Sequence, residues 1–282
     1  MAADMLNITF AAEATRLFNQ VPAQGPYTTA MSNSAIWVPL ANLTTNAASI
    51  IAQIRDLANA NSTSSSSSSS SSSLFHLPPE YNSDPTLLSG YRSQLAAIAT
   101  LLTQAPSLEA AFSTGNTSGL ATLHPLSRGT VRLDLTNPLA QPIVDYRSAS
   151  NPIDLTLHLA HLKYLRRMFQ APAMQALHAV ETQPGETVQS DEELLQYLRK
   201  GITQSYMHPC CTAAMLPLAK GGVVDTKLRV HGAAGLRVVD ASVFPVLPSS
   251  HLSSVVYAVA EKVCYFFTLS CQGYLVHVLD LS

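Results

Sequence analysis

The sequence is poor in charge and, over most of its length, has no long apolar run. Charged residues make up 12% of its 282 residues, about half of the ~25% that is usual for soluble domains. With 16 Lys and Arg against 18 Asp and Glu, the net charge is −2, so the basic surface of a nucleic-acid-binding protein is missing. Before residue 254 no apolar stretch approaches the ~20 residues that span a bilayer. Because 47% of the residues are apolar, we expect a globular chain with a sizeable core and neither nucleic acid nor a membrane as partner.

Cysteine is scarce as well, and its spacing does not suit a metal. The chain has four cysteines, of which Cys210 and Cys211 are adjacent while Cys264 and Cys271 lie far along the chain. Structural zinc sites use pairs of ligands at short spacings, and this pattern has none. We therefore expect structural or free thiols and no metal.

The first five residues contain neither a basic nor an apolar region, so we expect no signal peptide in this chain. Acceptor sequons for N-glycosylation, which matter only in a secreted protein, begin at Asn7, Asn42, Asn61 and Asn116. Two interpretations remain open: a cytosolic protein, or a chain whose true beginning is missing.

Apolar periodicity predicts helices over residues 10–20, 47–60, 85–102 and 152–169. A capping box at 190–193 predicts another helix that ends at Gly201. Alternation predicts strands at 130–135 and 143–146, and a further strand is expected at 236–239. The serine tract at 64–73 has no apolar surface to offset its ordering entropy, so we expect a flexible insertion over 62–73.

Three side chains on the 152–169 helix have a spacing that suits a metal. Asp154, His158 and His161 fall at i, i+4 and i+7 on one side of the helix. Since no cysteine or second carboxylate completes the set, the pattern favours a solvated polar face over a metal site.

Two histidines in the last third of the chain are candidates for chemistry. His208 precedes Pro209, whose ring restricts the backbone before it and so helps to fix the imidazole. His251 directly precedes an apolar helical stretch, where the free amides of a first turn can bind an anion or the electron-rich edge of a cofactor. The positive end of the helix dipole there favours a neutral imidazole that can act as a base.

Between and around these histidines the sequence resembles the closing signature of the glucose-methanol-choline (GMC) oxidoreductases, the flavoenzymes that oxidise alcohols. The matching segments are residues 208–212 (HPCCT), 222–225 (GVVD), 228–232 (LRVHG), 235–242 (GLRVVDAS) and 251–262, with 124–131 (HPLSRGTV) and 151–154 (NPID) upstream. The resemblance covers residues 120–262 well and residues 1–120 more loosely. The start of the chain is similar to the fungal branch of the family.

The resemblance implies FAD as the cofactor and a small-molecule alcohol or sugar as the substrate. His208 is then the proton acceptor for the substrate hydroxyl, and His251 binds the same oxygen while a hydride passes to the flavin. By the same reasoning, Asp240 and Ala241 line the FAD, and the amides of Leu252 and Ser253 face the flavin. For the full-length protein the sequons imply secretion.

The implied fold is α/β: an α+β substrate domain plus the C-terminal part of an FAD-binding α/β domain. Its predicted divisions are residues 1–119 and 120–204 of the substrate domain, 205–262 with the histidine pair and the FAD segment, and a divergent apolar tail at 263–282. We expect the N-terminal dinucleotide-binding half to be absent from this chain, because none of the 12 glycines has the G-x-G-x-x-G spacing.

Cys211 is a further departure from the pattern, because the family usually has glycine at this position and a Cβ there can crowd the backbone near His208. Two alternatives therefore stay open beside the alcohol-oxidising enzyme. One is a non-redox cyclase or dehydratase of the same family, similar to the versicolorin-type cyclases. The other is an inactive remnant that does not hold FAD.

Overall fold

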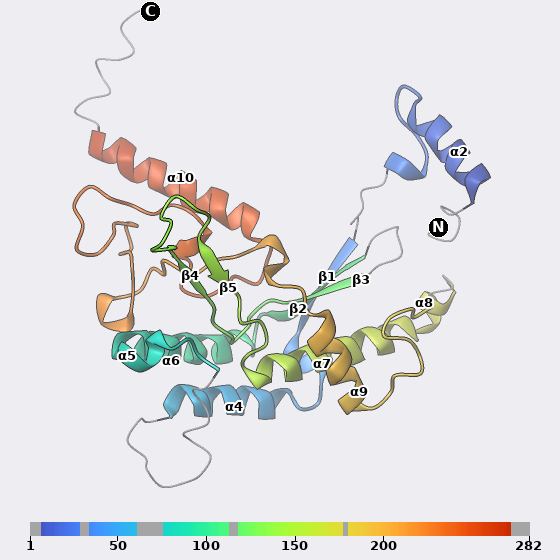
Figure 1. Ribbon diagram of the computed structural model, residues 1–282. Helices are drawn as coiled ribbons and strands as arrows, with labels where there is room; N and C mark the ends of the chain where they lie inside the picture. The colour runs from blue at the N-terminus through green and yellow to red at the C-terminus, as the bar shows by residue number, and fades with distance from the viewer. Residues whose placement is uncertain (1–6, 29–33, 61–75, 113–117, 177–179, 272–282) are drawn as a thin grey trace, which may run out of the picture.

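The computed structural model describes residues 7–28, 34–60, 76–112, 118–176 and 180–271, which form helices around a small central sheet (Figure 1). The α-helices are α2 (Ile8–Phe18), α3 (Leu40–Leu43), α4 (Ala47–Asn59), α5 (Glu80–Ser83), α6 (Pro85–Leu101), α7 (Pro152–Phe169), α8 (Pro172–Gln175), α9 (Asp191–Gly201) and α10 (Leu252–Cys271). The strands are β1 (Ser34–Pro39), β2 (Pro106–Phe112), β3 (Ser118–Thr122), β4 (Thr130–Arg132) and β5 (Ile143–Asp145). The 3-10 turns are η1 (Pro26–Thr28), η3 (Ser205–Met207), η4 (Leu218–Lys220) and η5 (Ala241–Val243).

The capping residues start the helices where the sequence predicts. The carboxylate of Asp84 accepts from the Thr86 amide at the start of α6, and Asn151 caps α7 in the same way. Ser190 and Glu193 form the predicted capping box, and α9 ends at Gly201. These helix starts are confirmed. They could be predicted from the sequence because a cap depends on residues within one turn of each other.

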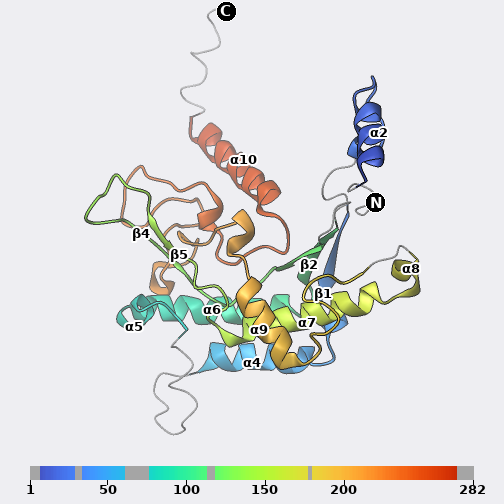
Figure 2. The ribbon, with the colours of Figure 1, turned by 45° about the vertical axis from the view of Figure 1, so that its right-hand side comes forward.

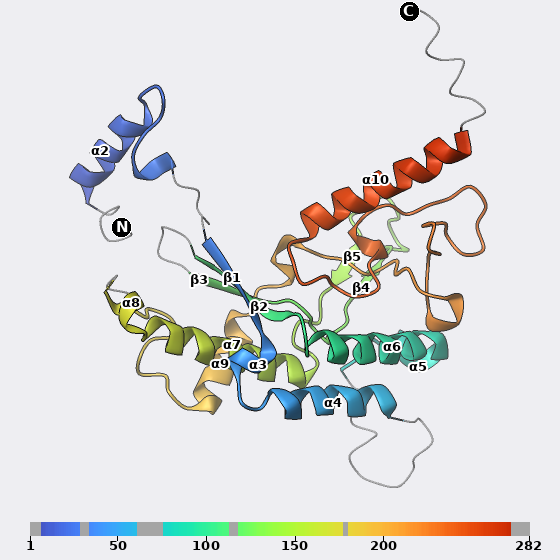
Figure 3. The same ribbon diagram turned by 180° about the vertical axis from the view of Figure 1, so that it is seen from behind.

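β2 is the central strand of the main sheet, paired antiparallel with β1 on one side and β3 on the other. The core lies between this sheet and α4, α6 and α7, and its largest fully buried side chains include Ile54, Leu95, Leu108 and Leu157. α10 lies at the opposite end of the molecule from α4 (Figures 2 and 3).

The second sheet is a short hairpin of β4 and β5. The strand predicted over 130–135 is wrong beyond Arg132, because the chain turns at Asp134. The Asp134 carboxylate accepts from the amides of Thr136 and Asn137 and from the Thr136 hydroxyl. This local turn replaces the ladder of a longer strand.

The strand predicted at 236–239 is also wrong. Its pairing is an isolated bridge between Arg237 and Arg229. The partner stretch begins with a turn in which the Asp225 carboxylate accepts from the amides of Lys227 and Arg229. The coarse expectation of a mixed α/β fold is confirmed, whereas the predicted domain divisions at 119, 204 and 262 remain predictions.

α10 continues past Lys262 to Cys271, into the segment predicted as a divergent tail. The predicted serine insertion at 62–73 lies outside the described residues, and so do residues 272–282 of the tail. Over the described ranges, no helix combines the length and the apolarity that crossing a bilayer requires.

Candidate functional site

His208 is fixed by a tight backbone turn. It follows η3, in which Tyr206 has a positive φ of 47°, and its Nδ1 lies 2.6 Å from the Tyr206 carbonyl oxygen. The rings of Tyr206 and His208 are nearly parallel, with an interplanar angle of 8°. Since a carbonyl only accepts, Nδ1 carries the hydrogen, which leaves Nε2 of the neutral ring with a lone pair.

His251 contacts His208 although the two lie far apart in the sequence. The Nδ1 atom of His251 is 3.4 Å from Nε2 of His208, and the ring centroids are 5.3 Å apart. His251 stands directly before α10, as the sequence predicts. The structure therefore brings the two predicted histidines together, while their catalytic roles remain predictions.

A buried carboxylate completes the pair, and the sequence analysis missed it. Glu109 lies on the central strand β2 with 5% of its surface exposed, and its Oε1 is 2.5 Å from Nε2 of His251. A buried carboxylate needs a hydrogen-bonding or charged partner, so this contact fixes the ring of His251. The only signal in the sequence was a glutamate that follows Leu108 and precedes the apolar residues 110–112.

These contacts determine which ring nitrogens of His208 and His251 donate hydrogen bonds and which accept them. His208 donates from Nδ1 to a carbonyl and His251 donates from Nε2 to Glu109, so both facing nitrogens are acceptors when both rings are neutral. The helix dipole favours a neutral His251, but the Glu109 carboxylate at its Nε2 opposes this effect. One added proton on His251, balanced by Glu109, makes its Nδ1 a donor that faces the acceptor Nε2 of His208. That state presents a donor and an acceptor side by side, which suits a hydroxyl group.

Two further side chains anchor the segment before His251. His124 is 1% exposed, and its Nε2 is 2.8 Å from the hydroxyl of Ser249. The side-chain amide of Gln94 on α6 donates to the carbonyl of Pro245 at 2.7 Å. The loop that carries His251 is thus tied to the core of the molecule.

The predicted cofactor residues lie close to the histidine pair. Asp240 caps η5 by accepting from the amide and the hydroxyl of Ser242, and the Ala241 carbonyl accepts from the Cys211 amide. Leu252 is buried with Val243 in one apolar cluster. The turn at 240–243 and the first turn of α10 therefore pack together, and both Asp240 and Ser253 are exposed.

The backbone at Cys211 has the conformation that the family's glycine would favour. Its φ is +72°, a left-handed value that costs a residue with a Cβ roughly 1–2 kcal/mol. The Cys211 amide is nevertheless held by Ala241 at 3.1 Å. The expected crowding at this position thus takes the form of an unfavourable backbone angle.

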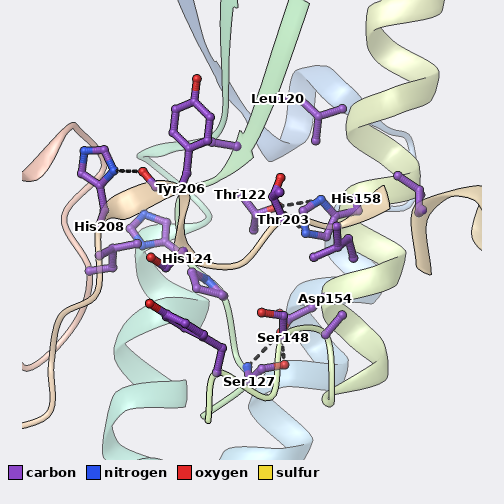
Figure 4. A pocket seen from close by; sticks show the side chains of 18 of the residues that line it. Leu120, Thr122, His124, Ser127, Ser148, Asp154, His158, Thr203, Tyr206 and His208 are labelled. Carbon is purple, nitrogen blue, oxygen red and sulfur yellow. Dashed lines mark hydrogen bonds between the residues drawn. The ribbon is translucent and has the colours of Figure 1, made fainter. Parts of the chain in front are cut away.

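His208 borders a large cavity, which Figure 4 shows from close by. Its volume is about 2400 Å³, and Tyr206, His124 and Arg128 also line it. A cavity of this size has room for a substrate beside His208.

The polar face predicted for Asp154, His158 and His161 is wrong, because these side chains are largely buried. Asp154 is 2% exposed and His161 is fully buried. Both oxygens of Asp154 are used, since they accept from the amides of Leu126 and Ser127 and from the Ser127 hydroxyl (Figure 4). Within the described ranges no group of three or more His, Cys, Asp or Glu is arranged to hold a metal ion. Asp154 instead ties α7 to the segment that follows β3, whereas His158 and His161 contact the strands themselves, at Thr122 of β3 and, for His161, also at Ser107 of β2.

Burial of His161 predicts a loss of stability in mild acid. Burial lowers the pKa of His161 to about 3, whereas the unfolded chain takes up a proton near pH 6.5. Below pH 6.5 the unfolded state therefore binds more protons than the folded state, and the free energy of unfolding decreases as the pH is lowered. We expect a loss of ~2 kcal/mol from this residue between pH 6.5 and pH 5.

Urea unfolding at several pH values tests this expectation. Burial also lowers the pKa of His76, His124 and His158, so the wild type should lose at least this much. The matched variant His161→Gln should lose less over the same range. Equal slopes for the wild type and the variant would contradict the assignment.

Comparisons with known proteins agree on one family. Residues 125–260 match the model of the GMC oxidoreductase C-terminal domain. The chain is 33% identical over 265 residues to the dehydrogenase xptC of Emericella nidulans, an alignment that covers 92% of this chain and 40% of that protein.

Two solved structures share the fold. A fungal aryl-alcohol oxidase is 49% identical with a TM-score of 0.80, and the match covers 93% of this chain and 43% of that one. An FAD-dependent oxidoreductase from Chaetomium thermophilum is 32% identical with a TM-score of 0.82, over 95% of this chain and 44% of that one. The chain thus spans less than half the length of these relatives.

Proposed function

Because this chain carries the C-terminal domain of the GMC oxidoreductase family, we propose that it is the substrate-binding and proton-transferring part of an FAD-dependent enzyme that oxidises CH–OH groups. The observation that carries the proposal is the contact between His208 and His251 at 3.4 Å. Relatives of the chain include a dehydrogenase and an aryl-alcohol oxidase. The proposed substrates are alcohols or sugars.

The residues around the histidine pair suit a flavin. Asp240 and Ser253 are exposed at the edge of an apolar cluster that contains Val243 and Leu252, and the first-turn amides of α10 adjoin His251. In the proposal, Asp240 and Ala241 hold the cofactor, together with the amides of Leu252 and Ser253. When bound, FAD supplies the acceptor for the substrate's hydride.

The histidines act on the substrate hydroxyl. Nδ1 of the protonated His251 donates to the hydroxyl oxygen, and that hydroxyl donates to Nε2 of His208, which accepts the proton. The Tyr206 carbonyl stabilises the positive charge that develops on His208, since it accepts from Nδ1. Removal of the proton makes the adjacent C–H a better hydride donor.

A chimaeric protein tests this proposal. The part of the fungal aryl-alcohol oxidase that precedes the matched region would be joined to this chain and purified with FAD. We expect flavin absorbance and reduction of an electron-accepting dye with benzylic alcohols or pyranoses. A chimaera that binds flavin but reduces dye with none of them would refute alcohol oxidation, and product formed without flavin reduction would favour the non-redox alternative.

Glu109→Gln in the chimaera is expected to lower turnover by about 10-fold to 100-fold, which corresponds to the ~1–3 kcal/mol of a disrupted buried polar contact. The neutral amide no longer balances a proton on His251, so His251 loses its donor toward the substrate. The matched control Glu13→Gln removes an exposed carboxylate that is paired with Arg16 and should leave turnover unchanged. Equal rates for the two variants would show that the charge of Glu109 is not used.

Secretion of the full-length protein is a second part of the proposal. Asn7 and Asn42 are exposed, as glycosylated asparagines must be, while the sequons at Asn61 and Asn116 lie outside the described residues. The full-length protein would be expressed in a secreting fungal host. Treatment of the secreted protein with a glycosidase should then lower its apparent mass relative to the untreated protein.

A further inference from the structure

Two adjacent thiols lie next to the histidine pair. Cys210 and Cys211 follow His208 and Pro209 directly, and both are free and partly exposed. Both line the same cavity as His208. A small oxidant that enters this cavity can therefore reach both sulfur atoms.

The two sulfur atoms interact and differ in character. The interaction between the two neighbouring thiols raises the pKa of Cys210, as burial also does, and it lowers the pKa of Cys211. Arg128 lines the same cavity, and its positive charge lowers the pKa of both thiols. Since the thiolate is the reactive form of cysteine, Cys211 is the nucleophile of the pair and Cys210 the proton donor.

We propose that Cys210 and Cys211 form a peroxide-reactive site in which Cys211 attacks and Cys210 closes a vicinal disulfide. The Cys211 sulfur attacks one oxygen of hydrogen peroxide, the O–O bond breaks, and Cys211 sulfenic acid and one water form. The Cys210 sulfur then attacks the Cys211 sulfur and displaces a second water. Overall, two thiols lose two electrons and two protons to one peroxide, which becomes two waters.

Such a disulfide would be reduced easily. Neighbouring Cα atoms lie ~3.8 Å apart across a trans peptide, closer than the ~4.4–6.8 Å of ordinary disulfides. Strained disulfides are the labile ones, so the modification is reversible. The distorted peptide is separated from His208 by Pro209 alone, and Cys211 is held to the turn at Ala241, so oxidation also alters the surroundings of the candidate base.

Mass spectrometry of the chain itself tests the site. Trypsin releases residues 201–220, which contain these two cysteines and no internal Lys or Arg. After peroxide treatment and alkylation, we expect this peptide without alkyl groups and lighter by two hydrogens, with both thiols restored by dithiothreitol. Two alkylated thiols after peroxide, or a Cys211 sulfinic acid with Cys210 alkylated, would overturn the proposal.

Two variants test the order of attack. In Cys210→Ser, we expect Cys211 sulfenic acid that dimedone traps. In Cys211→Gly, which suits the positive φ at that position, we expect Cys210 to stay alkylatable at the same peroxide concentration. Faster oxidation of Cys210 in Cys211→Gly than of Cys211 in Cys210→Ser would overturn the assignment. These measurements require neither FAD nor turnover. A failure of the thiol proposal can therefore be distinguished from a failure of the proposed function.

Discussion

His208→Ala in the flavin-loaded chimaera should lower the rate of alcohol-dependent dye reduction by about 10²–10⁴-fold, the range that a positioned general base contributes. Nε2 of His208 is the acceptor that faces His251 at 3.4 Å, and alanine offers no group in its place. Flavin absorbance should be retained, because the proposed cofactor residues at 240–241 and 252–253 are unchanged. Stopped-flow reduction of the flavin measures the step directly.

His231→Ala is the control for this variant. His231 is a partly buried histidine of the same C-terminal region, but its Nε2 contacts the carbonyl oxygen of Leu216 and has no role in the proposed chemistry. We expect it to retain turnover within a few-fold of the wild type. If His208→Ala reduces flavin as fast as this control, His208 is not the base.

Asp154→Asn should lower the free energy of unfolding by ~1–3 kcal/mol, as expected when a buried donor loses its charged acceptor. The Asp154 carboxylate accepts from the Leu126 amide at 2.7 Å and from the Ser127 amide at 2.8 Å. An amide side chain turns its NH₂ group toward one of these donors and leaves that donor buried without an acceptor. Urea unfolding of the chain at neutral pH measures the difference.

Asp134→Asn provides a matched comparison on the surface. The Asp134 carboxylate accepts from the same kinds of donor as Asp154, two backbone amides and a neighbouring hydroxyl, but it is partly exposed, whereas Asp154 is 2% exposed. Water replaces lost bonds there, so we expect a change within about 1 kcal/mol. Similar losses for the two variants would contradict the view that burial determines the cost.

The residues that sequence reasoning placed correctly depend on their near neighbours. Asp84 and Ser190 start helices by accepting hydrogen bonds from amides two or three residues away. A short stretch of sequence is therefore enough to predict where these helices begin. The failures have the opposite cause. Asp154 and His161 fit a polar helix face by spacing, and only the segment at 126–127 and the strands that pack on α7 reveal that they are buried.

The sequence by itself determined the helix starts, the family resemblance and the two candidate histidines, because caps, periodicity and motifs are local patterns. Only the tertiary structure decided that His208 meets His251 and that Glu109 from β2 supports the pair. Glu109 and His251 come from opposite halves of the chain, and their contact depends on how the sheet packs beneath the loop before α10. Such a contact is set by the packing of the whole core, which no local pattern encodes.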